Sequence, residues 1–316
     1  MQFAEEEERS RPGGEFYGSS AVILSDRWAT KLDSLKTILR ERGDTSFIVV
    51  SDFDHTLTHF TSEQCHDILG RHEDYSKEFT TEFTEIFNVP RAMDEWFRVA
   101  HDCIVDKSGL TSTMLQQRLE QRTITVRNGL REFVSNLREE GVPLVIVSAG
   151  IRDVVVHTLT AIEIDTSSDH LFHIDANYCQ FHADGQIANI LPEHPVHSES
   201  KKHAAQRAPH IFSFLSAQAS DCDQIEADIT IEGLETVTVN TVAIVMGDRP
   251  SDFTVLSTFT NVATFRVGFA RERDSQDAQA LLDEAQCDAV FIGEHGLESV
   301  HALVGELISV RKVHKQ

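Results

Sequence analysis

The strongest constraint on the fold comes from four short apolar runs, each of which ends in glycine or polar residues. They lie at residues 47–50, 142–147, 242–246 and 289–292. Continuous apolar runs of this length are typical of strands that are buried on both faces of a parallel sheet. Stretches with helical spacing of apolar residues separate several of the runs, and this alternation predicts an α/β fold. We therefore expect a doubly wound, Rossmann-like parallel sheet with helices on both faces.

One segment, residues 61–122, interrupts this alternation. Apolar residues recur there at helical spacing, for example at Phe79 and Phe83, and strand-like runs disappear. The pattern predicts a small helical cap that is inserted into the sheet domain. The α/β core would then consist of residues 20–60 together with residues 123–316.

Two further segments do not fit the core pattern. Residues 1–19 contain a run of glutamates and no long apolar stretch, which predicts a flexible acidic N-terminus rather than a signal peptide. Residues 216–240 are acidic and locally rich in β-type residues. We expect this second segment to form a surface insertion in the core.

Composition limits the partners that the chain can have. Lys and Arg number 28 against 51 Asp and Glu, which gives a formal net charge of −23. Such a surface argues against binding to nucleic acid or to an anionic membrane, because phosphate groups carry the same sign of charge. No apolar run approaches the ~18 residues of a membrane span. The cysteines are scattered and form no CxxC pair, which favours the reducing cytoplasm.

Four acidic residues stand where strands of the predicted sheet end. Asp52 and Asp54 follow the first apolar run, and Asp248 and Asp252 follow the third. Ligands of such sheets bind beyond the carboxyl ends of the strands. Carboxylates that lie close together and away from water repel one another unless a cation lies between them. Because carboxylate oxygens are ligands that Mg²⁺ prefers, the sequence predicts a magnesium site at this edge.

A second set of residues is suited to binding an anion. Ser148, Ala149 and Gly150 follow the second apolar run and offer a hydroxyl and backbone N–H groups before a helix. Lys201 and Lys202 can supply the positive charge that the chain as a whole lacks. Each group alone is common, but their order along alternating strands and helices indicates a site that handles phosphate.

The stretches that carry these residues resemble the haloacid dehalogenase (HAD) superfamily of phosphohydrolases, and within it the pyrimidine 5′-nucleotidase family, also called cytosolic 5′-nucleotidase III. The matching stretches are SDFDHTLTHF, MDEWFRVAH, VPLVIVSAGIRDV, VHSESKKHA and VMGDRPSDF. The resemblance implies a HAD-type core with an inserted cap. It also implies a Mg²⁺-dependent phosphomonoesterase that acts on a small molecule, with a nucleoside 5′-monophosphate favoured.

The resemblance implies a role for each acidic residue. Asp52 is the nucleophile that attacks phosphorus, gives an aspartyl-phosphate and also binds the metal. Asp54 is the general acid for the leaving oxygen and then the general base for water, and its backbone carbonyl binds the metal. Asp248 is a metal ligand, and Asp252 either binds the metal through water or orients the other ligands.

The remaining site residues are also assigned by resemblance. Ser148, the N–H groups of Ala149 and Gly150, and Lys201 hold the phosphoryl oxygens. An ungapped match favours Lys201 over Lys202, which would then be exposed at the start of a helix.

Residues in and near the cap follow the same resemblance less closely. Thr56 matches a threonine that steadies the nucleophile loop, and Phe97 and His66 match neighbours of the base. Asn88 stands near the position of a base-reading glutamate, and Ala100 replaces a serine that contacts substrate. The loss of a carboxylate and a hydroxyl removes hydrogen bonds that discriminate between bases, so the preferred base stays open.

Other functions remain open at this stage. One is a related phosphatase of a small non-nucleotide phosphoester such as phosphoserine, and another is phosphate transfer from a nucleotide to a second nucleoside. A non-catalytic binding protein would be expected to lack one of the acidic or lysine positions, and none is missing. Monomer and dimer are not distinguished. Four loosely spaced histidines are interpreted as packed or solvated side chains rather than transition-metal ligands, namely His170, His173, His194 and His197.

Overall fold

The computed structural model of the chain describes most of the predicted core and cap. The predicted acidic N-terminus at 1–19 lies outside the described residues, as does the predicted insertion at 216–240 apart from its last two residues. The described residues are 22–41, 45–70, 75–121, 124–167, 169–207 and 239–313.

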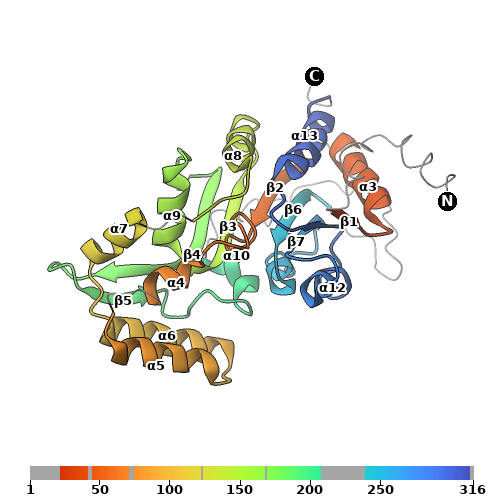
Figure 1. Cartoon of the computed structure of the whole chain (residues 1–316). Helices are drawn as coiled ribbons and strands as arrows, with labels where there is room; N and C mark the ends of the chain where they lie inside the picture. Colours follow the sequence, from red (N-terminus) through yellow and green to blue (C-terminus); the bar gives the residue numbers. More distant parts are fainter. Residues whose placement is uncertain are drawn as a thin grey trace.

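A single eight-stranded sheet forms the centre of the molecule, with the strand order β1-β8-β7-β6-β2-β3-β4-β5 (Figure 1). Neighbouring strands run parallel from β8 to β4, and the two edge strands, β1 and β5, run antiparallel to their neighbours. The strands are β1 (Val22–Leu24), β2 (Ser46–Ser51), β3 (Leu144–Ile151), β4 (Phe172–Phe181), β5 (Ile187–Leu191), β6 (Thr241–Gly247), β7 (Val262–Ala270) and β8 (Ala289–Ile292).

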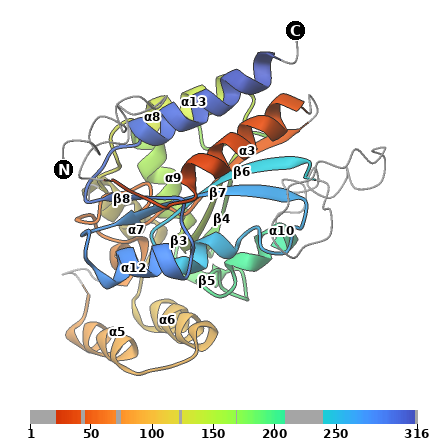
Figure 2. The ribbon, with the colours of Figure 1, turned by 90° about the vertical axis from the view of Figure 1, so that its right-hand side faces the viewer.

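Helices cover both faces of this sheet. In both views α3 and α13 lie side by side over the sheet, whereas α5 and α6 lie together beyond its edge, where α6 packs against β5 (Figure 2). The described α-helices are α3 (Trp28–Glu41), α4 (Cys65–Gly70), α5 (Lys77–Asn88), α6 (Met93–Lys107), α7 (Ser112–Gln121), α8 (Leu130–Glu139), α9 (Arg152–Ala161), α10 (Ala204–Arg207), α12 (Gln276–Asp283) and α13 (Glu298–Val313). Two short 3₁₀ helices are η1 (Lys201–His203) and η2 (Pro250–Thr254).

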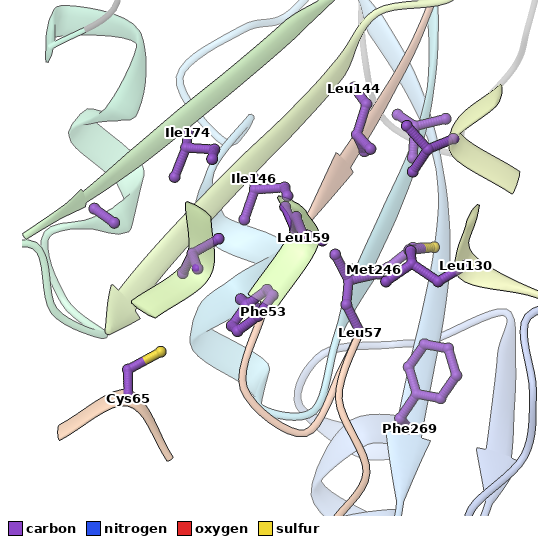
Figure 3. Packing of buried hydrophobic residues seen from close by; sticks show 14 of the residues in the cluster. Phe53, Leu57, Cys65, Leu130, Leu144, Ile146, Leu159, Ile174, Met246 and Phe269 are labelled. Carbon is purple, nitrogen blue, oxygen red and sulfur yellow. The ribbon is translucent and has the colours of Figure 1, made fainter. Parts of the chain in front are cut away.

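Alternate residues of the central strands face two separate apolar clusters. In β3, Leu144 and Ile146 belong to one cluster, and Val145 and Val147 belong to the other. Successive side chains of a strand point to opposite faces, so a strand covered on both faces is apolar at every position. The fold class predicted from the apolar runs is therefore confirmed. Figure 3 shows part of the first cluster, including Leu144 and Ile146.

One strand extends beyond its predicted end. The second apolar run predicts a strand at 142–147 followed by a turn, but β3 continues to Ile151. Ser148, Ala149 and Gly150 are therefore part of the strand. Their pairing with β4 is irregular, because the register shifts between Val147 and Ile151. This irregular end lets backbone groups of the motif leave the regular ladder of hydrogen bonds.

Helices α4 to α7 lie between β2 and β3 in the sequence, in the interval where a cap is predicted. The chain enters and leaves this interval through two segments that lie side by side. Thr58 and Val126 form an isolated antiparallel bridge. The His59 N–H donates to the Thr125 carbonyl at 2.9 Å, and the Arg127 N–H donates to the Leu57 carbonyl at 2.9 Å. The paired segments support the predicted division into core and cap, which stays a prediction.

In the described ranges, no helix combines the length and the apolar character needed to cross a membrane.

Candidate active site

Three carboxylates meet at the carboxyl ends of β2 and β6. These strands are parallel neighbours, and the Asp52 N–H donates to the Met246 carbonyl at 3.0 Å. One carboxylate oxygen each of Asp52, Asp248 and Asp252 lies within 4.8 Å of the others. The η2 turn fixes Asp252, whose Oδ2 accepts hydrogen bonds from the N–H groups of Asp248 at 3.1 Å and Arg249 at 2.9 Å. Of the four acidic residues that the sequence predicts at this edge, these three converge, and the Asp54 carboxylate is not in the group.

Lys201 bridges two of the carboxylates. Its Nζ lies 2.5 Å from Asp52 Oδ1 and 2.6 Å from Asp252 Oδ1. The lysine is only 3% exposed, whereas Lys202 is exposed. Burial acts to lower the pKa of Lys201, but attraction to Asp252 and Asp52 outweighs burial and raises that pKa above its ordinary value. The lysine therefore carries its charge into the site.

The carboxylates outnumber the ammonium group that faces them. Burial, together with repulsion from Asp252 and Asp248, raises the pKa of Asp52 above its ordinary value, although Lys201 opposes this shift. Burial likewise raises the pKa of Asp252. Three carboxylates and one ammonium leave two negative charges uncompensated when all four are ionised. A divalent cation would balance this charge.

The donor set fits a hard divalent cation. All three converging groups are carboxylates, and hard cations such as Mg²⁺ select oxygen ligands. Within the ranges that the structure describes, these carboxylates form the one group of three or more converging metal-ligand side chains. The four histidines excluded as metal ligands on sequence grounds form no such group there.

The Asp54 carboxylate contacts the first residue of α4. Its two carboxylate oxygens each lie 3.3 Å from the Cys65 N–H nitrogen, and its Oδ1 lies 3.3 Å from Cys65 Sγ. Burial raises the pKa of Asp54 to about 6, although the hydrogen bonds from Cys65 act to lower it. Burial, and next to it the charge of Asp54, raise the pKa of the Cys65 thiol, which stays protonated and able to donate.

The predicted phosphate motif lies at the buried end of β3. Ser148 is 1% exposed, and its Oγ accepts a hydrogen bond from the Gly150 N–H at 2.9 Å. The Gly150 N–H is therefore engaged within the motif, although the sequence predicts that it faces phosphate. The Ser148 hydroxyl proton and the Ala149 N–H remain as candidate donors to an anion.

Asn177 of β4, which sequence reasoning missed, ties this motif to the segment that carries Lys201. Its Nδ2 donates to the Ala149 carbonyl at 2.8 Å and to the Val196 carbonyl at 2.9 Å. Its Oδ1 accepts from the Val196 N–H at 2.8 Å. One side chain thus sets the spacing between the serine motif and the chain that leads to the lysine. The sequence offers no local signal for this role, because β4 carries several polar residues and does not form an apolar run.

The loop that follows Asp52 is held by Arg127, a second residue that sequence reasoning missed. Arg127 is fully buried and donates to the carbonyls of Thr56 at 2.8 Å and His55 at 2.7 Å. Within the loop, the His55 N–H donates to Thr58 Oγ1 at 2.8 Å. Thr56, the threonine singled out by the sequence, is buried, and its hydroxyl has no hydrogen-bond partner among the described residues.

The predicted base neighbours belong to a cluster of aromatic and histidine side chains. The rings of His66 and Phe97 meet edge to face with centroids 5.4 Å apart, and His197 stacks on Phe97 at 5.7 Å. His66 Nε2 lies 3.2 Å from His101 Nε2. Burial lowers the pKa of His66 to about 4 and that of His101 to about 3, so both rings are neutral near pH 7. The cluster therefore offers flat faces and neutral hydrogen-bonding edges.

Two positions in the predicted cap depart from the family pattern. Asn88 is exposed at the end of α5, and Ala100 is fully buried in α6. The buried Ala100 side chain offers no hydrogen bond to a base.

Comparison with known proteins shows the family of the chain. A model of the pyrimidine 5′-nucleotidase (UMPH-1) family matches residues 38–308. The 7-methylguanosine phosphate-specific 5′-nucleotidase of Mus musculus is 23% identical over 309 residues, which cover 91% of this chain and 93% of that protein. The Homo sapiens protein of the same name is 22% identical over 309 residues, with the same coverage of 91% and 93%.

Solved structures share the fold. Cytosolic 5′-nucleotidase IIIB bound to cytidine superposes with a TM-score of 0.69 at 16% identity, covering 93% of this chain and 96% of that one. A HAD family hydrolase from Salmonella enterica serovar Typhi gives a TM-score of 0.51 at 14% identity, covering 83% of this chain and 73% of that one.

Proposed function

The chain belongs to the pyrimidine 5′-nucleotidase family of phosphoric monoester hydrolases, and on that premise we propose that it hydrolyses nucleoside 5′-monophosphates with Mg²⁺ as cofactor. The observation that carries the proposal is the buried ammonium of Lys201 between Asp52 and Asp252, with Asp248 beside them. The proposal is supported because the carboxylate that we take as the nucleophile, Asp52, lies next to an ammonium group and two further carboxylates that could bind a cation. The ammonium group also supplies the local positive charge that an anionic substrate needs in an acidic chain.

In the proposed reaction, the Asp52 carboxylate attacks phosphorus, and the bond from phosphorus to the nucleoside 5′-oxygen breaks. The proton on the Asp54 carboxyl passes to that oxygen, which leaves as the nucleoside hydroxyl. Asp54 then accepts a proton from the water that attacks the aspartyl-phosphate, so that phosphate is released and Asp52 is restored. The proposal is supported by the burial of both carboxyl groups at the carboxyl end of one strand.

Positive charge and hydrogen-bond donors would hold the phosphoryl oxygens. Lys201, the Ser148 hydroxyl and the Ala149 N–H are the candidates, and Gly150 joins them if its N–H turns away from Ser148. Asp52, Asp248 and Asp252 would hold the Mg²⁺ ion, with the Asp54 backbone carbonyl as a further proposed ligand. When bound, the ion would neutralise charge on the cluster and on the phosphoryl oxygens.

The cluster around Phe97 supports a nucleoside as the leaving group. His66 directly follows Cys65, which contacts Asp54, and His197 lies one helical turn before Lys201. The aromatic face of Phe97 and the neutral imidazole of His66 are suited to a planar base. We propose a small-molecule nucleotide as the partner and the cytoplasm as the location, because the related enzyme of known structure is named cytosolic.

Phosphate release from a panel of substrates tests the proposal. The panel contains CMP, UMP, 7-methylguanosine monophosphate, phosphoserine and a sugar phosphate, each with MgCl₂ and with EDTA. We expect release from at least one nucleotide with Mg²⁺ and none with EDTA or in Asp52→Asn. The matched control is Asp33→Asn, a change at a side chain that is 79% exposed, and it should keep wild-type turnover.

Two outcomes would overturn parts of the proposal. Release confined to phosphoserine or to the sugar phosphate would remove the nucleotidase assignment and leave the phosphatase. Wild-type turnover in Asp52→Asn would remove the nucleophile.

The aspartyl-phosphate is tested by adding a nucleoside acceptor and analysing the products of several nucleotide donors. One common intermediate requires the same ratio of transfer to hydrolysis for every donor. A ratio that changes with the donor would argue against it.

A further inference from the structure

Every hydrogen bond that the described residues make to the Asp54 carboxylate comes from Cys65. The backbone N–H nitrogen of Cys65 lies 3.3 Å from both carboxylate oxygens, and its Sγ lies 3.3 Å from Oδ1 alone. Oδ1 therefore accepts two donors from one residue. Oδ2 shares the N–H and receives no other donor, so it is the oxygen with capacity to hold a proton.

The position of Cys65 is fixed by close packing. The residue begins α4 and is fully buried. A Cβ atom at Gly150 would lie 2.7 Å from Cys65 Sγ and 2.8 Å from Cys65 Cβ, closer than atoms can approach. Gly150 is not in the left-handed backbone region, so its missing side chain serves the space that the thiol occupies. The phosphate motif and α4 are thus packed against each other through Cys65.

On the basis of the function proposed above, we propose that Cys65 is the positioning residue for Asp54. Its N–H and S–H groups hold the carboxyl in one orientation, with the proton on Oδ2 and aimed at the leaving oxygen. In the step concerned, the bond from phosphorus to the leaving oxygen breaks, the Oδ2 proton passes to that oxygen, and Asp54 becomes a carboxylate that Cys65 stabilises. Cys65 itself forms no bond to substrate.

This role differs from simple packing in one measurable way. A nucleoside leaves as a strongly basic alkoxide and needs the proton from Asp54, whereas p-nitrophenolate is a weak base and leaves without it. Loss of the S–H donor should therefore slow nucleotide hydrolysis and leave p-nitrophenyl phosphate hydrolysis nearly unchanged. A packing defect would slow both reactions alike.

The experiment compares kcat/KM for the best nucleotide and for p-nitrophenyl phosphate in the full-length enzyme with Mg²⁺. The readout is the ratio of the two values, which does not depend on the fraction of enzyme that is folded. In Cys65→Ala we expect this ratio to fall about tenfold, the factor that corresponds to one hydrogen bond. Cys65→Ser keeps a donor and should restore the ratio to within about twofold of wild type.

Two control variants give the ratios expected without and with loss of the proton donor. Cys103→Ala changes another buried cysteine, on α6, whose thiol forms no hydrogen bond among the residues that the structure describes, and its ratio should equal that of wild type. Asp54→Asn should show the same selective loss as Cys65→Ala but to a greater extent.

Each outcome is decisive for Cys65. An unchanged ratio in Cys65→Ala, which includes an equal loss of both activities, would overturn the positioning role. A ratio in Cys65→Ser as low as that in Cys65→Ala would also overturn it. Failure of the proposed function looks different, because the wild-type enzyme itself would then release no phosphate from nucleotides.

Discussion

Replacement of Asp248 by asparagine should remove the stabilisation that Mg²⁺ gives to the folded chain. The change deletes one of three carboxylates that converge within 4.8 Å, at a side chain that is 12% exposed. A ligand that binds the native state alone at 100 times its Kd stabilises that state by about 2.7 kcal/mol. If the loss of one anionic ligand weakens binding about 100-fold, the same concentration stabilises the variant by only about 0.4 kcal/mol.

These free energies convert into melting temperatures. For 316 residues, an unfolding entropy of about 2.1 cal/mol/K per residue gives roughly 0.66 kcal/mol/K. Wild type should therefore melt about 4 °C higher with saturating MgCl₂ than with EDTA, and Asp248→Asn less than about 1 °C higher. In EDTA the variant should melt no lower than wild type, because Asp248 raises the pKa of both Asp52 and Asp252 by repulsion.

Thermal unfolding followed by circular dichroism, across a MgCl₂ titration and in EDTA, measures both shifts. Asp33→Asn, whose side chain is exposed, is the control and should retain the full increment. The reasoning is refuted if Asp248→Asn and Asp33→Asn gain the same increment, or if wild type gains none at millimolar Mg²⁺.

Three further predictions concern the buried groups around the site. Lys201→Met leaves buried carboxylates without their ammonium, so in EDTA it should lower the free energy of unfolding by about 3–5 kcal/mol in urea titrations; an unchanged midpoint would contradict this. Gly150→Ala should cost about 1–3 kcal/mol through the clash with Cys65, whereas Gly305→Ala, in open space on α13, should be neutral or stabilising. The pKa of His101 falls from 6.5 to about 3 on burial, so the unfolded chain binds a proton that the folded chain does not, and below pH 6.5 this costs stability. His101→Gln should remove that cost. The free energy of unfolding of the variant minus that of wild type should increase by about 1.4 kcal/mol for each unit by which the pH falls from 6.5 to 4. A difference that does not change with pH would count against the neutral histidine.

The central strands could be predicted because helices cover both faces of the sheet. Every residue from 47 to 50 in β2 and from 242 to 246 in β6 then faces an apolar cluster, and the sequence there is an unbroken apolar run. β4 gave no such signal, because it carries Asp175 and Asn177. Both are buried next to partners far along the chain, and Arg207 pairs with Asp175 at 2.7 Å. Local patterns contain no information about such distant partners.

In the candidate site, too, features that follow from local patterns could be predicted, and features that depend on contacts between distant residues could not. The convergence of Asp52, Asp248 and Lys201 was predictable because motif order and strand direction bring strand ends together. Cys65 and Arg127 act through contacts that form only when the chain has folded, with the Asp54 carboxylate and with loop carbonyls. A buried arginine or a cysteine at the start of a short helix has no periodic or motif signature. Their contacts are seen only in the folded structure.

The bridge between Thr58 and Val126 has a consequence for how the family can diversify. Because the segments that contain Thr58 and Val126 are paired, any insertion between them begins and ends at the same place on the sheet domain. Helices there can be lengthened, exchanged or rebuilt while the three converging carboxylates keep their places. Such a junction allows the inserted helices to change, and substrate specificity with them, while the carboxylate cluster stays the same.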